Sequence, residues 1–396
     1  MPNLRPSILK LACVILAFLI ITYLLSSTIP DWKRVASTLP LETVVDKENQ
    51  EIVQNLKEVK SGIEDKTPLI LLYTTVFREA PRPPTDCKVK CDFSTNKDDI
   101  RIADAVVFHG GDFMVSDVPR ERGQPFQKWV FWSMEAPGAK FLTEKDGIPA
   151  LKPDWMMTYS YASDIKHVYG GFFVPPDEAK KRNFHPIANF TTEQILKDKQ
   201  FHGAIGFISN CVNKERLRVA KALSRYIRVD IGGKCAYDKS KVDLCPHGKD
   251  CTPIINWSYF YLAFENVICD DYVTEKMTNT LSLPIIPIVM SKRVYKNRFP
   301  PEAFIAVDDF KNVKELAKHL TYLMKHPKEY VKLFEWRKQW GRAAWESSGY
   351  ENGLCGLCKK LQTDGLSKTE PIQNITEWRE ERGECSTTVL PSSFYR

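Results

Sequence analysis

The chain has 396 residues, 43% of them hydrophobic and 11% aromatic, which is enough for two globular domains with appended segments. Its net charge of +7, from 56 basic and 49 acidic residues, is modest, and the basic residues do not cluster like a nucleic-acid footprint. Nucleic-acid binding is therefore not expected, and the excess charge favours at most an anionic substrate or an acidic membrane surface.

The first 66 residues predict a membrane anchor followed by a stem. Residues 11–29 carry no charge and are long enough to span a bilayer, and residues 1–10 form a short cytoplasmic tail. A cleaved signal peptide is the alternative, but its apolar core usually has about 7–15 residues, so an uncleaved anchor is favoured. Residues 30–66 are mostly polar, and a solvated tether is the simplest interpretation. Apolar residues at heptad-like intervals would also permit a short amphipathic helix and a homodimer through this stem.

Cysteines and glycosylation sequons point to an oxidising lumen. The chain has 11 cysteines, ten of them outside the predicted anchor. Three sequons begin at Asn189, Asn256 and Asn374. Together with the anchor, these features indicate a secretory glycoprotein with disulfides whose connectivity is not readable from sequence. The Cys355-Gly-Leu-Cys358 motif could be half a zinc site, a redox motif or a short-loop disulfide, and the compartment favours the disulfide.

Residues 67–195 predict the first α/β domain. Buried strands are expected within 69–77, 105–108, 129–132 and 155–159, separated by polar, helix-capable or loop segments. Alternation of this kind predicts a parallel sheet covered by helices. A charged, Pro-containing linker from Pro175 to about Gln200 should end this domain.

Residues 196–360 predict a second α/β domain, and residues 361–396 a C-terminal tail. Strands are expected at 204–209, 227–233, 259–264, 285–290 and 304–307, with a basic helix over 213–226. The chain contains no Gly-x-Gly-x-x-Gly motif, so no nucleotide fingerprint identifies this half as a Rossmann fold.

The stretch from Tyr259 to Lys276, YFYLAFENVICDDYVTEK, is the most informative part of the chain. A buried strand breaks into polar residues, and ligands in open α/β sheets lie beyond the carboxyl ends of strands. If a helix begins at Val273, then Tyr272, Glu275 and Lys276 share its opening face, where amides and a lysine suit a phosphate. The alternative is a capped turn and a helix with a surface ion pair.

At these residues the chain resembles a known family. FENVICDDYVTEK is similar to the signature of the α1,3-fucosyltransferases of glycosyltransferase family 10, Phe-Glu-Asn followed by a short spacer and Tyr-Val/Ile-Thr-Glu-Lys. The resemblance covers roughly residues 68–358, including the segments at 104–109, 125–137, 163–165, 208–210 and 298–310.

The resemblance implies an inverting enzyme of the GT-B type, with two Rossmann-like domains facing a cleft. It would move L-fucose from GDP-β-L-fucose to the 3-hydroxyl of a GlcNAc residue, either in the N-glycan core or in an antenna. It would be a single-pass type II protein of the Golgi membrane, with its catalytic domains in the lumen. Two rivals are a transferase of the same build that uses another nucleotide sugar and a membrane-anchored glycan-binding relative with weak or lost turnover.

Glu135 is the candidate catalytic base. It follows the apolar segment WVFWSM and precedes Ala136-Pro137, where the family has Glu-Ser-Pro and its proposed base. Inverting transfer needs one carboxylate to take the acceptor proton. The apolar residues that precede Glu135 would raise the pKa of its carboxyl group. Without the resemblance, a surface or capping carboxylate would be the more common role for such a residue.

Arg216 is the candidate phosphate ligand, because a guanidinium offers a planar fork to phosphate oxygens. The family has such an arginine shortly after a Ser-Asn pair, here Ser209-Asn210, although Lys214 or Arg218 could take this place. A solvated basic helix is the alternative.

The signature itself supplies the other donor contacts that the resemblance implies. Asn266, Tyr272 and Glu275 would contact the fucose, ribose or base of GDP-fucose, and Lys276 its phosphates.

Two further patterns bear on the donor site. Asp270-Asp271 lacks the Asp-x-Asp spacing typical of nucleotide-sugar enzymes, so no metal ligand is assigned, and Mn²⁺ or Mg²⁺ is expected at most to stimulate. Pro284 and Ser291 stand where the family usually has glycines, so the loops there lose the freedom of glycine at positive φ.

Overall fold

The structure is a computed structural model in which the chain divides into two units, residues 1–66 and 67–396. The predicted tail, anchor and stem lie outside the part that it describes. Within the described part, no helix is long and apolar enough to cross a membrane. The described residues are 67–85, 87–114, 116, 118–137, 150–246, 248–343, 351–365, 367–383, 385–386 and 390–395.

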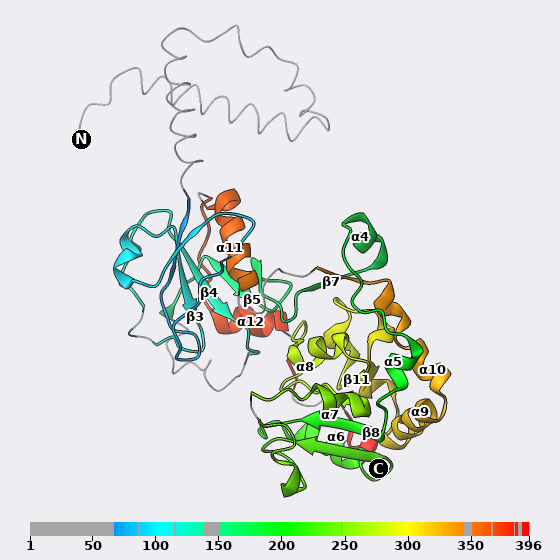
Figure 1. The fold of residues 1–396 in the computed structure, drawn as a ribbon. Helices are drawn as coiled ribbons and strands as arrows, with labels where there is room; N and C mark the ends of the chain where they lie inside the picture. Colours follow the sequence, from blue (N-terminus) through cyan, green and yellow to red (C-terminus); the bar gives the residue numbers. More distant parts are fainter. Residues whose placement is uncertain are drawn as a thin grey trace, which may run out of the picture. The chain divides into compact units, whose positions relative to one another are not determined.

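The first sheet has six strands, and every pairing in it is parallel, as the sequence predicts (Figure 1). The order is β2-β1-β3-β4-β5-β6. The central strands β3, β4 and β5 are buried along their whole length, which is typical of a parallel sheet covered on both faces. The bounds are β1 (Leu69–Leu72), β2 (Asp92–Ser94), β3 (Ala105–His109), β4 (Lys128–Ser133), β5 (Trp155–Thr158) and β6 (Ile165–Lys166).

Strand β1 is shorter than the predicted apolar run over 69–77. Phe77 and Arg78 adopt φ angles of 52° and 67°, and the residues flanking them, Val76 and Glu79, form an antiparallel bridge. A tight turn therefore replaces the end of the expected strand.

The second sheet is also parallel, with the order β12-β11-β10-β8-β9. Its strands confirm the predicted series, and the basic helix α6 follows β8 as expected. The bounds are β8 (Phe201–Phe207), α6 (Lys214–Leu223), β9 (Arg228–Gly232), α7 (Thr252–Trp257), β10 (Ser258–Leu262), α8 (Glu275–Thr278), β11 (Ile286–Val289), β12 (Ile305–Ala306), α9 (Val313–Lys325) and α10 (Pro327–Lys332).

The remaining elements are short, apart from the two C-terminal helices α11 and α12. The predicted linker contains α4 and α5 and ends where β8 begins. Strand β7 pairs antiparallel with β13. These elements are β7 (Phe172–Val174), α4 (Pro176–Lys181), α5 (Thr192–Leu196), β13 (Gly341–Ala343), α11 (Glu351–Asp364) and α12 (Ile375–Gly383). The 3₁₀ helices are η2 (Lys97–Arg101), η6 (Lys239–Lys241), η7 (Asn279–Ser282), η8 (Lys292–Tyr295), η9 (Pro301–Ala303), η10 (Val307–Asp309), η11 (Glu335–Lys338) and η12 (Ser392–Tyr395).

The C-terminal part of the chain returns to the first sheet, whereas the sequence predicts a second domain over 196–360 with a tail over 361–396. Leu354, Leu357 and Leu361 of α11 are buried in the same core cluster as Ile70 and Trp132 of the first sheet. Helix α12 packs against the opposite face, because its Ile375 is buried with Phe131, which alternates along β4 with Trp132. Figure 1 shows α11 and α12 beside β3, β4 and β5. The spacing of these leucines indicates an amphipathic helix, but it carries no information about which sheet the helix covers.

All ten cysteines outside the predicted anchor form disulfides, which confirms that the chain is disulfide-bonded. The predicted Cys355–Cys358 pair is wrong. The two residues lie one turn apart on α11, and each pairs with a different cysteine of the loop before β2. The five pairs are Cys87–Cys355, Cys91–Cys358, Cys211–Cys235, Cys245–Cys251 and Cys269–Cys385.

Tryptic mapping without reduction should distinguish the two pairings of the CxxC motif. Trypsin cuts after Lys88 and Lys90, so Cys87 and Cys91 fall on separate peptides, whereas Cys355 and Cys358 share one. We expect all three peptides to remain joined. Recovery of the Cys355 peptide by itself, with an internal disulfide, would contradict the observed pairing.

Candidate active site

Glu135 lies just beyond the carboxyl end of β4, as its sequence context predicts. Its backbone N–H donates to Ser133 Oγ at 3.2 Å, and its side chain is half-buried. The hydroxyl of Tyr272, from the signature segment of the second sheet, donates to Glu135 Oε2 at 3.1 Å. The structure therefore brings together two predicted site residues that are 137 positions apart.

The surroundings of Glu135 favour a stronger base than an exposed glutamate. Burial raises the pKa of Glu135, and this effect outweighs the Tyr272 hydrogen bond and the positive charges of Lys276 and Arg379, which lower the pKa. The expected increase in the pKa of Glu135 is therefore confirmed in direction. A carboxylate with a raised pKa is suited to accept a proton from a hydroxyl group near neutral pH.

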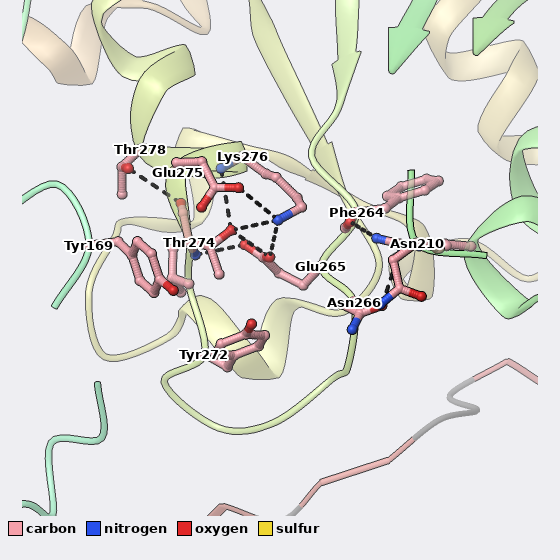
Figure 2. A network of polar contacts seen from close by, with 12 residues as sticks. Tyr169, Asn210, Phe264, Glu265, Asn266, Tyr272, Thr274, Glu275, Lys276 and Thr278 are labelled. Carbon is pink, nitrogen blue, oxygen red and sulfur yellow. Dashed lines mark hydrogen bonds and ion pairs between the residues drawn. The ribbon is translucent and has the colours of Figure 1, made fainter. Parts of the chain in front are cut away.

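Glu265 organises the signature segment, a role that the sequence analysis did not assign to it. It follows β10 and is buried, and its two carboxylate oxygens accept from the Thr274 backbone N–H and hydroxyl, both at 2.7 Å. Lys276 Nζ lies 3.5 Å from the same carboxylate. Figure 2 marks this ion pair with a dashed line. The signal in the sequence is an acidic residue at the end of an apolar strand, where a buried charge requires partners.

Lys276 is held by two carboxylates. Its Nζ lies 2.9 Å from Glu275 Oε1 and 3.0 Å from Thr274 Oγ1 (Figure 2). Burial alone would lower the pKa of Lys276, but the carboxylates of Glu265 and Glu275 outweigh burial and raise the pKa above its usual value. Lys276 is therefore a fixed positive charge, and its contact with a phosphate remains a prediction.

The predicted helical face is wrong, because the helix begins at Glu275 and not at Val273. Thr274 is extended and its hydroxyl accepts from the Lys276 backbone N–H, so it acts as the N-cap. Asp271 has a φ angle of 62° and turns the chain shortly before this N-cap. Tyr272 therefore lies outside the helix and points its hydroxyl to Glu135 instead of sharing a face with Lys276.

Arg216 is buried and joins the ends of two strands of the second sheet. Its guanidinium donates to the carbonyls of Phe264, at 3.1 Å, and Asn210, and to Asn266 Oδ1 at 3.3 Å. The alternative of a solvated basic helix is thus wrong for Arg216, although Lys214 and Arg218 of the same helix are exposed. Arg216 and Asn266 lie together, and their contacts to a donor remain predictions.

Asp270 and Asp271 have structural partners. Asp270 pairs with Arg293 at 2.6 Å, whereas Asp271 accepts from the Tyr161 backbone N–H at 3.0 Å and from Asn297 Nδ2 at 3.2 Å. Within the described ranges, no group of three or more His, Cys, Asp or Glu residues could hold a metal ion.

The two positions where the family usually has glycine adopt ordinary backbone conformations. Ser291 is extended, with a φ angle of −144°, and its hydroxyl donates to Asp308 Oδ2 at 2.7 Å. Positive φ angles at described non-glycine residues occur only at Phe77, Arg78, Asn183 and Asp271. The freedom of glycine is therefore not needed at Pro284 or Ser291 in this chain.

Two family descriptions match most of the chain. "Fucosyltransferase, N-terminal" matches residues 65–170, and "Glycosyltransferase family 10 (fucosyltransferase) C-term" matches residues 196–378. The two matches include Glu135 and the complete signature segment.

The chain is similar to several curated enzymes. It is 30% identical over 353 residues to Alpha-(1,3)-fucosyltransferase fut-5 of Caenorhabditis elegans, an alignment that covers 83% of this chain and 86% of the relative. It is 30% identical over 328 residues to Alpha-(1,3)-fucosyltransferase C of Drosophila melanogaster, covering 78% and 73%. It is also 30% identical over 318 residues to a human 4-galactosyl-N-acetylglucosaminide 3-alpha-L-fucosyltransferase, covering 77% and 82%.

Among solved structures, the fold is similar to one described as "Crystal Structure of alpha1,3-Fucosyltransferase". The TM-score is 0.47 at 15% identity, over 79% of this chain and 93% of that one. A likeness of this size is too weak to support an argument about the site. The length and identity of the curated matches, together with both family descriptions, show that the chain belongs to glycosyltransferase family 10, the fucosyltransferases.

Proposed function

We propose that this protein is an inverting α1,3-fucosyltransferase, which moves L-fucose from GDP-β-L-fucose to the 3-hydroxyl of a GlcNAc residue in a glycoprotein glycan. Family membership and the names of the curated relatives support the sugar and the linkage. The observation that carries the proposal is the contact between Glu135 and Tyr272, which joins a base of raised pKa to the signature segment.

In this proposal Glu135 accepts the proton of the acceptor hydroxyl while the hydroxyl oxygen attacks the anomeric carbon of fucose. The bond between that carbon and the phosphate oxygen breaks, and GDP leaves from the opposite face. The β-linked donor then yields an α-linked product. A single carboxylate is sufficient, because no covalent intermediate has to form.

Lys276 and Arg216 are proposed to stabilise the negative charge that develops on GDP. An ammonium group has three donors, and Lys276 already has Glu265, Glu275 and Thr274 as neighbours. Glu275 is the most exposed of the carboxylates around Lys276, with 54% of its side chain accessible, so a phosphate would replace this partner most readily. Asn266, Tyr272 and Glu275 remain the proposed contacts for the fucose, ribose or base.

The cellular setting is proposed from the sequence and the disulfides. Five disulfides among the described residues are typical of a secretory compartment. We propose a single-pass type II Golgi protein anchored by residues 11–29, with its two parallel α/β sheets in the lumen as a GT-B enzyme. Pairing through the stem at 30–66 is part of the same proposal.

The proposed activity is tested by GDP release from GDP-fucose with a panel of glycans that carry core or antennal GlcNAc. We expect release only when an acceptor with a free GlcNAc 3-hydroxyl is present. Release from a different nucleotide sugar, or glycan binding without any release, would refute the proposal in favour of the other transferase or the binding protein.

The pH dependence of the reaction should report the environment of Glu135. The base must be ionised, and its folded pKa is raised, so kcat/KM should fall as pH decreases through a value above that of an ordinary glutamate. In Tyr272→Phe the hydrogen bond that lowers this pKa is lost, and the acid limb should move to higher pH. Tyr322→Phe, at an exposed position on α9, is the control. Identical acid limbs in Tyr272→Phe and the wild type would rule out Glu135 as the titrating base.

A further inference from the structure

The C-terminal end of the chain contacts both sheets around the proposed base. We call residues 375–395 the C-terminal strap; it consists of α12 and the described residues that follow it. Ile375 is buried in the core of the first sheet, and Phe394 in that of the second. The C-terminal family description ends at residue 378, so most of the strap lies beyond the residues that this description matches.

Arg379 of the strap contacts the residue that carries the base. It is buried, and one of its terminal nitrogens donates to the backbone carbonyl of Glu135. Its guanidinium also forms a hydrogen bond with Tyr159. The Tyr159 ring packs against Tyr272, with 4.9 Å between ring centroids, and the Tyr272 hydroxyl donates to the Glu135 carboxylate. Arg379 therefore takes part in a closed ring of contacts around the base.

The strap is fixed to the spacer of the signature motif. Asp270 N–H donates to the Gly383 carbonyl at 2.7 Å, at the last residue of α12. Ile268 and Ser386 exchange two backbone hydrogen bonds, at 3.2 and 2.7 Å. The Cys269–Cys385 disulfide lies between these contacts. The spacer leads directly to Tyr272. The strap is therefore joined both to Glu135 and to the loop that holds Tyr272, the hydrogen-bond partner of Glu135.

We propose that Arg379 is a positioning residue for Glu135, and that the disulfide-anchored strap holds Glu135 and Tyr272 at their observed separation. This inference rests on the proposed function. General-base catalysis requires the carboxylate to lie within hydrogen-bond reach of the acceptor hydroxyl, and a displacement of about 1 Å can reduce the rate by about 10²-fold. Another buried arginine, Arg337, likewise donates to backbone carbonyls. Arg379 differs from Arg337 because the carbonyl that it binds belongs to the proposed base.

The test compares Arg379→Gln and Arg379→Lys with Arg382→Gln in the full chain. Arg382 lies on the same helix but contacts Glu381 and Trp378, away from the base. We expect Arg379→Gln to lower kcat by about 10²-fold, with GDP affinity within about twofold of wild type. Arg379→Lys should recover part of the loss, and Arg382→Gln should resemble wild type.

A pH profile separates positioning of the base from a general loss of structure. The charged and titratable groups around Glu135 are Tyr159, Tyr272, Lys276, Glu275 and Arg379. The positive charge of Arg379 lowers the pKa of Glu135, so Arg379→Gln should move the acid limb of kcat/KM to higher pH, whereas Arg379→Lys should leave it near the wild-type position. An unchanged kcat and acid limb in Arg379→Gln would overturn the inference, as would a GDP affinity that falls as much as kcat.

Wild-type turnover separates failure of this inference from failure of the proposed function. If wild type releases no GDP from GDP-fucose, the proposed function is wrong; if wild type is active and Arg379→Gln equals it, only the inference is wrong. Should Arg379→Gln fail to fold, the strap is tested by replacing Cys269 and Cys385 together with serine. We expect a lower kcat with GDP binding retained, and wild-type turnover in this variant would overturn the inference. The matched control replaces Cys245 and Cys251, a pair whose partners are close in sequence, with serine.

Discussion

Replacing Glu135 by Gln should lower kcat by about 10²–10⁴-fold, the usual contribution of a general base. Glutamine has the same shape and can still accept the Tyr272 hydrogen bond, but it cannot take up the acceptor proton. GDP affinity should stay near the wild-type value, because neither the signature segment nor Arg216 is altered. The measurement is kcat with saturating donor and acceptor, together with calorimetric titration of GDP.

Glu335→Gln is the matched control for that experiment. Glu335 is on η11, pairs with Lys338 and lies outside the proposed site. Turnover close to wild type in correctly folded Glu135→Gln would show that another group takes the proton.

Lys276→Ala and Arg216→Ala should each weaken GDP binding by about ten- to hundredfold. A charge-assisted hydrogen bond that is shielded from water contributes about 1.5–3 kcal/mol, which corresponds to this range. An exposed surface ion pair contributes only about 0–1 kcal/mol, but the Lys276 side chain is 23% accessible and its partner Glu265 is buried. The double variant should be less than additive if both cations bind the same diphosphate.

Stability has to be measured alongside affinity for these variants. Without Lys276, the buried Glu265 carboxylate loses its nearest positive charge, and without Arg216 the carbonyls of Phe264 and Asn210 lose a donor. Calorimetry should therefore be performed well below the melting temperature of each variant. Lys292→Ala is the control, since Lys292 is exposed and pairs with Asp309. Unchanged GDP binding in folded Lys276→Ala would mean that the donor phosphates bind elsewhere.

The local features of this fold are readable from the sequence. Strands β3, β4, β8 and β10 each contain an apolar run, because strands of a covered parallel sheet are buried on both faces. The same apolar patterns place Glu135 and the signature segment at strand ends. Ligands bind at the carboxyl ends of parallel strands. The motif spacing was also sufficient to indicate the family.

Contacts between distant segments were decided only by the tertiary structure. The spacing of Cys355 and Cys358 suggests a local pair. Both lie on α11, however, and each pairs with a cysteine more than 260 positions earlier. Arg379 is separated from Glu135 by 244 positions, and no local pattern relates the two. The start of α8 depends on Thr274, whose hydroxyl and backbone are held by the buried Glu265. Sequence periodicity encodes which face of an element is buried, but the partner of that face depends on how the whole chain packs.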